Sequence, residues 1–445
     1  MARSKTGKAN KENNGKNKEK LRDRKQAIKA EKAAAKKQKK AAAKAERTAF
    51  AENLLHNGIT LKDRYDFPLL VMILIMSIFG MAMVFSAGYY STINSTDPDP
   101  FYYLKRQGFY IVSGWVLMMI FANFNYHNYR KISNAIIGVS IGLLILVLLV
   151  GINTGGATRW LGYGSLRITP SEISKLAVII FTSVYVSENP EAVKTSKGLG
   201  VLVLILAVHF ALIVKQPNLS TAIVIAAIIV ALMMVAGMNL ILLVVPVLLG
   251  VAGYFYIMTF QKDSHWYVRL TSFLDPFADS QGDGYQVSQG LIALGNGGLK
   301  GLGFGKSMTK NLYLPEPQND FILAVIGEEL GYIGFLVLMA AYMFMLFRLI
   351  KIALEAKDSL GFYLATGVAV MLGLQVIINV AVVTASMPAT GITLPFISYG
   401  GTSMWSFMAA MGIALNVSRS GTAARKAKRK KQKITAAAET AEALS

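Results

Sequence analysis

Three of the four acidic residues in the stretch LPEPQNDFILAVIGEELG, which covers residues 314–331 and is otherwise largely apolar, stand out. Asp320 precedes the apolar run, whereas Glu328 and Glu329 lie within it. On a helix with a rise of 1.5 Å per residue, Glu328 would lie about 12 Å beyond Asp320 and be rotated by about 80°. The three carboxylates are therefore not expected to form one cluster. Asp320 itself suits two roles that the spacing does not separate: a helix cap or a base that accepts a proton from a hydroxyl group.

A second group of ionisable residues lies in GATRWLGYGSLRITPSEISKLAV, at residues 156–178. Pro170 followed by Glu172 is typical of a helix start with an acid in the first turn. Glu172 and Lys175 are three residues apart and would share a helix face. They could form a salt bridge that lets both charges enter a membrane, or Lys175 could face a polar cavity. By depth, Lys175 is also the nearest candidate partner for the two glutamates of the first stretch.

Other polar residues of these segments suggest binding rather than proton transfer. Arg159 and Arg167 are cations suited to phosphate oxygens. Trp160 could anchor the chain at a membrane interface or offer a stacking surface to a sugar. GLGFGKS, at residues 301–307, lacks the first glycine of the pattern GxxxxGK[ST], because that position is Lys300. Its glycines therefore predict tight turns rather than a nucleotide site.

The composition is that of a membrane protein. Of the 445 residues, 53% are hydrophobic and 16% are charged, whereas globular domains have about 45–50% and about 25%. Ten apolar segments are long enough to be considered as membrane spans. Because every backbone polar group in lipid must be satisfied internally, we expect an all-α bundle of ten transmembrane helices. The segments are 67–87, 108–124, 133–151, 173–187, 198–214, 219–237, 239–260, 321–348, 360–385 and 396–417.

The charge distribution predicts the orientation of the bundle. Residues 1–66 hold 20 of the 46 Lys and Arg residues, and 418–445 hold 8 more. Basic segments stay in the cytoplasm, so both tails, 1–66 and 419–445, are expected there on either side of a membrane domain at 67–418. The first tail is predicted to be disordered. Both tails could contact anionic lipids, and neither requires a nucleic acid partner.

This orientation places a long extracellular loop, 261–320, between the seventh and eighth helices. A connection of some 60 residues is too long to be passive. Two shorter outer segments, 152–172 and 388–395, are also polar or rich in turn residues. We expect the chemistry where these three segments meet. The chain has no cysteine, which excludes disulfides, thiolate catalysis and Cys-ligated zinc.

Taken together, these motifs resemble the SEDS family of membrane proteins, named for shape, elongation, division and sporulation and typified by FtsW, RodA and SpoVE. The resemblance covers about Phe67 to Ser418. Within it, YLPEPQ at 313–318 and GITLPFISYGG at 391–401 favour the division and sporulation branch. The motifs that carry it are ATRWL at 157–161, TPSEISKLA at 169–177, KQPNLSTA at 215–222, GDGYQVSQGLIALGNGGLKGLGFG at 282–305, YLPEPQNDFILAVIGEELGYIG at 313–334 and TGITLPFISYGGTS at 390–403.

The resemblance implies a peptidoglycan glycosyltransferase that polymerises lipid II at the outer face of the bacterial cytoplasmic membrane during cell division. The family's catalytic aspartate stands in a segment usually written TDF, here NDF, so that role falls on Asp320, acting as general base in an inverting reaction. A divalent cation such as Mg or Mn would suit a pyrophosphate leaving group, but no ligand cluster identifies one. The residues expected to bind substrate are Arg159, Trp160, Glu172, Lys175, Lys306, Gln318 and Ser398.

Two positions depart from the family pattern. Asn218 stands where the family often has Asp, and Gln318 with Asn319 stands where it often has His-Thr. Neither change affects Asp320. The family usually works with a class B penicillin-binding protein, a transpeptidase, and other division proteins at the septum. Two alternatives stay open: a lipid II flippase, which would not need the long outer loop, and a non-catalytic division scaffold, which would leave the outer motifs unexplained.

Overall fold

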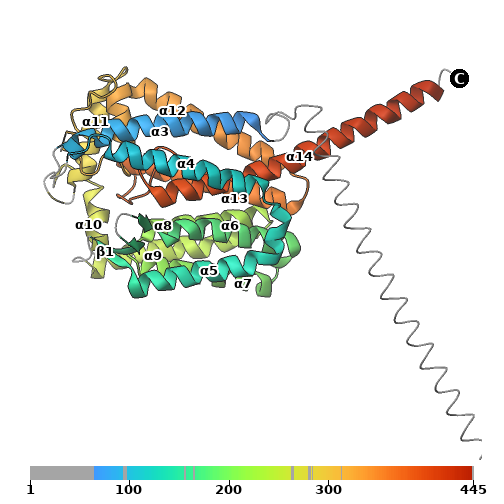
Figure 1. Ribbon diagram of the computed structural model, residues 1–445. Helices are drawn as coiled ribbons and strands as arrows, with labels where there is room; N and C mark the ends of the chain where they lie inside the picture. The colour runs from blue at the N-terminus through green and yellow to red at the C-terminus, as the bar shows by residue number, and fades with distance from the viewer. Residues whose placement is uncertain are drawn as a thin grey trace, which may run out of the picture. The chain divides into compact units, whose positions relative to one another are not determined.

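The computed structural model describes residues 65–93, 98–154, 157–163, 166–261, 265–278, 282, 284–311 and 313–442. The expectation for the first tail therefore lies, except for its last two residues, outside the described part. From Tyr65 onward the chain forms one unit, built mainly of long helices (Figure 1). The helices are α3 Phe67–Ile93, α4 Tyr102–Asn123, α5 Tyr129–Val150, α6 Pro170–Glu188, α7 Ser196–Val214, α8 Leu219–Val235, α9 Val244–Phe260, α10 His265–Ser272, α11 Tyr285–Gly297, α12 Ile322–Leu354, α13 Ser359–Val383 and α14 Gly401–Glu442, with short 3-10 turns at Tyr126–Asn128, Ala192–Lys194 and Leu240–Leu243.

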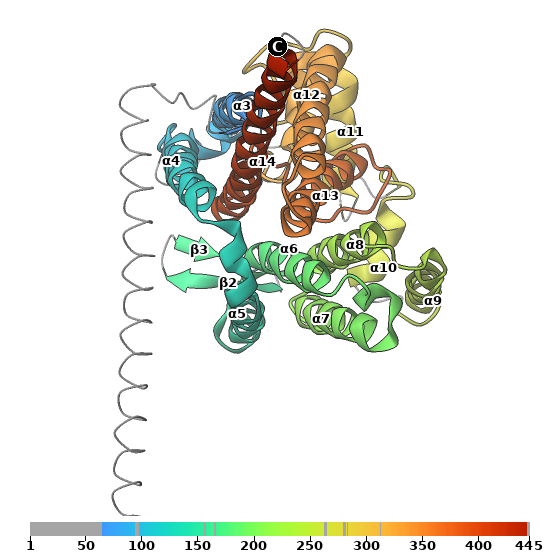
Figure 2. The ribbon, with the colours of Figure 1, turned by 90° about the vertical axis from the view of Figure 1, so that its right-hand side faces the viewer.

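The long helices form two groups that run side by side. Figure 2 shows α3, α4, α12, α13 and α14 in one group and α5 to α9 in the other. α6 joins the groups, because it packs against α13 and α14 on one side and against α5 and α8 on the other. The core follows from this arrangement: α6, α13 and the first part of α14 are the most buried segments, and α6 carries Glu172 and Lys175.

Each of the ten apolar segments predicted from the sequence overlaps one of these helices. Among the described residues, five helices are long and apolar enough to cross a membrane by length and composition: Phe67–Ile93, Tyr126–Val150, Ser196–Val214, Ile322–Leu354 and Ser359–Val383. A helical membrane protein with several spans is therefore confirmed. The count of ten spans stays a prediction.

The segment 261–320 is not simply a loop, because it contains α10 and α11. α11 forms because its apolar face has a surface to pack on: Val287 and Ala293 are buried, and Gly290 lies against the ring of Phe321. The segment after α5 forms a small antiparallel sheet of β1 Ile152–Thr154, β2 Ala157–Tyr163 and β3 Leu166–Ile168, in the order β1-β2-β3. The strands and these two helices gather at one end of the bundle (Figure 1).

The start of α12 bears on the helix cap predicted at Asn319 or Asp320. The helix begins at Ile322, and Phe321 occupies the N-cap position. The predicted cap position was therefore wrong, and the role of Asp320 as a base stays a prediction. Phe321 is fully buried beneath α11, and this packing, which the sequence does not reveal, fixes where the helix starts.

A break inside α12 explains the glycine-rich segment. Gly331 has φ 68° and ψ −169° within the helix. There the backbone of Leu302 and Gly303 donates hydrogen bonds of 3.0 and 2.9 Å to the carbonyls of Glu328 and Glu329. At Gly301 (φ 76°), a Cβ atom would lie 2.2 Å from the Glu329 carbonyl oxygen. Only glycine permits this close approach of two backbones.

Contacts at the opposite end of the bundle hold the first and last described segments together. Asp66 forms an ion pair with Arg348, and its backbone N–H donates to the Ser418 hydroxyl at 3.1 Å.

Asp358 caps α13 by accepting from Gly361 N–H at 2.8 Å. Partial burial opposes ionisation of Asp358, but this bond and the His127 ring at 2.6 Å outweigh it and lower the pKa of Asp358.

Candidate functional site

Residues 388–403, called here the 388–403 segment, connect α13 to α14 and contact the motifs that the sequence singled out. The backbone N–H of Tyr399 donates to the carbonyl of Gln318 at 2.9 Å. The hydroxyl of Thr402 accepts from the N–H of Thr169, one residue before α6, at 3.1 Å. Gln318 and Thr169, from two of the segments predicted to meet, therefore both contact this connection, but at Tyr399 and Thr402, beyond the predicted stretch 388–395.

Phe396, in the middle of the 388–403 segment, has a backbone conformation that is rare for a bulky residue. Its φ is 66°, a strained region for side chains other than glycine, asparagine and aspartate. The surroundings hold it there: the Tyr342 hydroxyl donates to the Pro395 carbonyl at 2.6 Å, and a Cβ at Gly80 of α3 would lie 2.3 Å from the Phe396 carbonyl oxygen. Such strain, of order 1–3 kcal/mol, is most common at functional sites.

Asp320 lies against this segment. It is half-buried, and its backbone carbonyl accepts a 2.8 Å hydrogen bond from the side-chain amide of Asn379 in α13. Its carboxylate faces Gly391, where an added Cβ atom would lie 4.0 Å from Oδ2. Gly391 has φ 70°, a backbone conformation that favours glycine. The position opposite the Asp320 carboxylate therefore carries no side chain. The carboxylate is thus positioned at the surface of the bundle end that carries the sheet.

The predicted pair of Glu172 and Lys175 is confirmed as a contact. Lys175 Nζ lies 2.7 Å from Glu172 Oε1 and also donates to Gln375 Oε1 of α13 at 2.7 Å. Only 2% of the Lys175 side chain is exposed. The carbonyl of Glu172 accepts from the Ser406 hydroxyl at 2.9 Å. The pair is therefore enclosed by α6, α13 and α14.

The prediction that Lys175 would pair with the acids of α12 is wrong. Glu329 is fully buried, and its Oε1 atom pairs with Lys310 at 2.6 Å and accepts from the Ser86 hydroxyl at 2.7 Å. Glu328 accepts from the hydroxyls of Ser307 and Thr309. The partners of the two glutamates come from α3 and from the segment before α12. That segment packs over the break in α12 and covers both glutamates.

The remaining predicted binding residues lie at the same end of the bundle. Trp160 is half-buried in β2, opposite Ile152 of β1. Arg159, also half-buried, donates to the carbonyls of Gln216, at 3.2 Å, and Pro217 in the α7–α8 turn. Lys306 is exposed within the glycine-rich segment. Two of these three residues, Arg159 and Lys306, are basic.

Gln318 and Ser398 are both used within the protein. Gln318 is 3% exposed, and its side-chain amide donates to the Tyr103 hydroxyl at 2.9 Å. The Ser398 hydroxyl accepts from Leu394 N–H at 2.7 Å, and its carbonyl accepts from Gln107 at 3.4 Å. These contacts shape the 388–403 segment, and a direct role in substrate binding stays a prediction.

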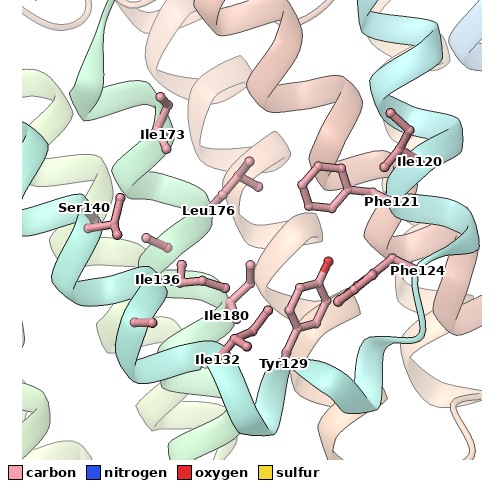
Figure 3. A pocket seen from close by; sticks show the side chains of 13 residues that line it. Ile120, Phe121, Phe124, Tyr129, Ile132, Ile136, Ser140, Ile173, Leu176 and Ile180 are labelled. Carbon is pink, nitrogen blue, oxygen red and sulfur yellow. The ribbon is translucent and has the colours of Figure 1, made fainter.

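An apolar groove of about 450 Å³ lies between α4, α5 and α6 (Figure 3). Its lining includes Phe121, Ile136, Ile173 and Leu176. Ile173 and Leu176 each follow a member of the Glu172–Lys175 pair in sequence, so α6 presents the pair to the core and apolar side chains to the groove.

Comparison with known proteins identifies the family. A family model described as "Cell cycle protein" and labelled FtsW, RodA and SpoVE matches residues 67–423. The chain belongs to this family. A "Probable peptidoglycan glycosyltransferase FtsW" of Geobacter metallireducens is 35% identical over 367 residues, which cover 80% of this chain and 95% of the relative. "Stage V sporulation protein E" of Bacillus subtilis is 38% identical over 363 residues, covering 81% and 98%.

Solved structures of the FtsW/RodA/SpoVE family share the fold. The rod shape determining protein RodA of Thermus thermophilus matches with a TM-score of 0.59 and 27% identity, covering 80% of this chain and 97% of RodA. A chain described under "Structural coordination of polymerization and crosslinking by a peptidoglycan synthase complex" matches with a TM-score of 0.64 and 26% identity, covering 80% and 98%.

The divalent cation suggested by the resemblance would need a set of acidic or imidazole ligands. Among the residues that the structure describes, no group of three or more His, Cys, Asp or Glu side chains is arranged to hold a metal ion. Two of the buried acids are paired with cations: Glu172 with Lys175 and Glu329 with Lys310.

Sequence reasoning missed four residues that build the site of this family member. Gln375 and Asn379 contact Lys175 and Asp320, Tyr103 contacts Gln318, and Lys310 neutralises Glu329. A signal for the first two was present: they are amides four residues apart in an otherwise apolar segment, and buried polar groups require partners.

Proposed function

We propose that this protein is a peptidoglycan glycosyltransferase that polymerises lipid II into glycan strands at the outer face of the bacterial cytoplasmic membrane. Membership of the family and the names of its relatives support a glycosyltransferase. The observation that carries the proposal is the half-buried Asp320, held beside the 388–403 segment, which also contacts Thr169 just after the sheet.

In the proposed reaction Asp320 acts as general base. Its carboxylate accepts the proton of the 4-hydroxyl group of the acceptor N-acetylglucosamine, while that oxygen attacks C1 of the donor sugar. The bond from C1 to the undecaprenyl pyrophosphate breaks, and the configuration at C1 inverts. Arg159 and Lys306 supply positive charge for the departing pyrophosphate. Lys175 is buried against Glu172 and bonds to Gln375, so it joins α6 to α13. In this proposal it affects the site by holding these two helices together.

The groove between α4, α5 and α6 is the proposed place for a lipid tail of the substrate. It is apolar and runs along α6 from Ile173, next to Glu172, towards Ile180 (Figure 3). An acyl or prenyl chain loses contact with water there without displacing a helix.

Filling this groove should weaken substrate binding. We expect Ala135→Trp, at an exposed groove position of α5, to raise the KM for lipid II by about five-fold or more with kcat nearly unchanged, because it removes binding that the ground and transition states share. Ala207→Trp, at an exposed position of α7 outside the groove, is the control. Equal KM values for the two variants would mean that the groove does not bind a lipid tail of the substrate.

The proposed orientation places both termini in the cytoplasm. Contact between Asp66 and Ser418 supports ends that leave the bundle on one side. Because the chain has no cysteine, single cysteines can report the sides. Lys306→Cys should react with a membrane-impermeant thiol reagent in intact cells, and Lys197→Cys, at the other end of the bundle, only after permeabilisation. The reverse pattern would invert the orientation and remove Asp320 from the outer face.

We propose a class B transpeptidase and other division proteins as partners, at the division septum. The solved peptidoglycan synthase complex supports a transpeptidase partner. Purified protein mixed with lipid II, with and without this transpeptidase, tests the function: glycan polymers are the expected product. A flippase would instead move labelled lipid II across a liposome membrane without polymer, and a scaffold would do neither.

A further inference from the structure

Two buried amides lie one helical turn apart on α13. Gln375 and Asn379 are each 1% exposed, and residues four apart share a helix face. Burying an amide is costly unless it is hydrogen-bonded. Their hydrogen-bond partners therefore indicate what the pair does.

Asn379 connects Asp320 to the 388–403 segment. Its Nδ2 atom donates to the carbonyl oxygens of Asp320 and Ile392, both at 2.8 Å. Two carbonyl acceptors fix which end of the amide faces them, because only the nitrogen can donate. Ile392 follows Gly391, which faces the Asp320 carboxylate. One side chain thus fixes both the backbone of Asp320 and the surface opposite its carboxylate.

Gln375 connects the Glu172–Lys175 pair to the same segment. Its Oε1 atom accepts from Lys175 at 2.7 Å, and its Nε2 atom points to the carbonyl of Thr393 at 3.5 Å. Thr393 follows Ile392, the residue that Asn379 binds. The ion pair and Asp320 are therefore tied to adjacent residues of one segment by adjacent turns of one helix.

We propose that Asn379 is a positioning residue for Asp320, and that Gln375 links the Glu172–Lys175 pair to the same segment. The inference rests on the proposed function, in which Asp320 is the base. Without the Asn379 amide, the two carbonyls lose their common donor, and the turn that carries Asp320 is free to move away from Gly391. A shift of about 1 Å in a reacting group can lower a rate by about 100-fold.

A matched pair of variants tests this role with lipid II as substrate. Asn416 does a similar structural task at the far end of the bundle: it is 6% exposed, donates to the Ala122 carbonyl at 2.6 Å and accepts from Tyr126 N–H at 3.1 Å. We expect Asn379→Ala to lower kcat by about 10- to 100-fold with KM within about two-fold. Asn416→Ala should lose comparable thermal stability and keep kcat. Equal kcat values for the two would overturn the proposal.

A double-mutant cycle separates positioning from general damage. If Asn379 acts through Asp320, then Asn379→Ala should cost less than about two-fold in an Asp320→Asn background, because the group it positions is already inactive. Full additivity of the two losses would contradict the proposal. If the wild-type protein makes no polymer, the proposed function fails, whereas a normal wild type with additive variants rejects only the role of Asn379.

A second variant tests the same role if the Asn379→Ala protein does not fold. Asn379→Asp keeps the shape of the side chain but replaces the amide group that donates to the carbonyls of Asp320 and Ile392. An ionised carboxylate has no proton to donate, so kcat should fall as in Asn379→Ala while KM stays within about two-fold. A folded Asn379→Asp variant with the wild-type kcat would overturn the proposal.

Discussion

Asp320→Asn should give a folded protein that polymerises lipid II at least about 100-fold more slowly, the usual size of a general-base contribution. Asparagine has nearly the same shape, and the backbone carbonyl that binds Asn379 is unchanged. What is lost is the ability to accept the proton of the attacking hydroxyl group. Initial rates with labelled lipid II and thermal unfolding of the same preparations measure the two sides of this expectation.

The control is Asp99→Asn. Asp99 is a partly exposed acid before α4, with its pKa lowered by the hydrogen bond from Lys105. The variant removes one negative charge as Asp320→Asn does, and it should polymerise lipid II at the wild-type rate. A similar loss in both variants would mean that net charge, not a base, explains the effect.

Lys175→Met should lower the yield of folded protein, its polymerisation rate, or both. The substitution leaves Glu172, of which 14% is exposed, without its ion-pair partner, and breaking a buried pair by removing one member costs about 3–5 kcal/mol. It also removes the hydrogen bond to Gln375. Detergent-solubilised yield, thermal unfolding and polymerisation rate are the measurements. Full yield together with full rate would leave Lys175 with neither a structural nor a functional role.

The double variant Glu172→Gln/Lys175→Met distinguishes stability from activity. Replacing both members of a buried pair by neutral groups is often far less costly than removing one. We therefore expect the yield to recover while the rate stays low, because Gln375 still lacks its donor. Recovery of both the yield and the polymerisation rate would mean that the pair contributes to stability alone.

Local patterns predicted much of this fold. Apolar segments located the long helices, because backbone hydrogen bonds must close within such segments. The i, i+3 spacing predicted the contact of Glu172 with Lys175, and Pro170 marked the start of α6.

Features that depend on distant parts of the chain were missed or misassigned. The partner of Glu329 is Lys310, which reaches it only because the chain folds back over the break at Gly331. The cap position of α12 falls on Phe321, which packs under α11. No local pattern encodes either contact. The link from Asn379 to Asp320 likewise joins residues that are 59 positions apart.

The most direct test of the account compares the wild-type protein and Asp320→Asn in the same liposomes with lipid II, the transpeptidase partner and no other glycosyltransferase. Glycan strands are separated by length after a fixed time. The account predicts a ladder of polymers from the wild type and at least about 100-fold less product from the variant. Ladders of equal intensity from both proteins, or none from the wild type, would contradict it.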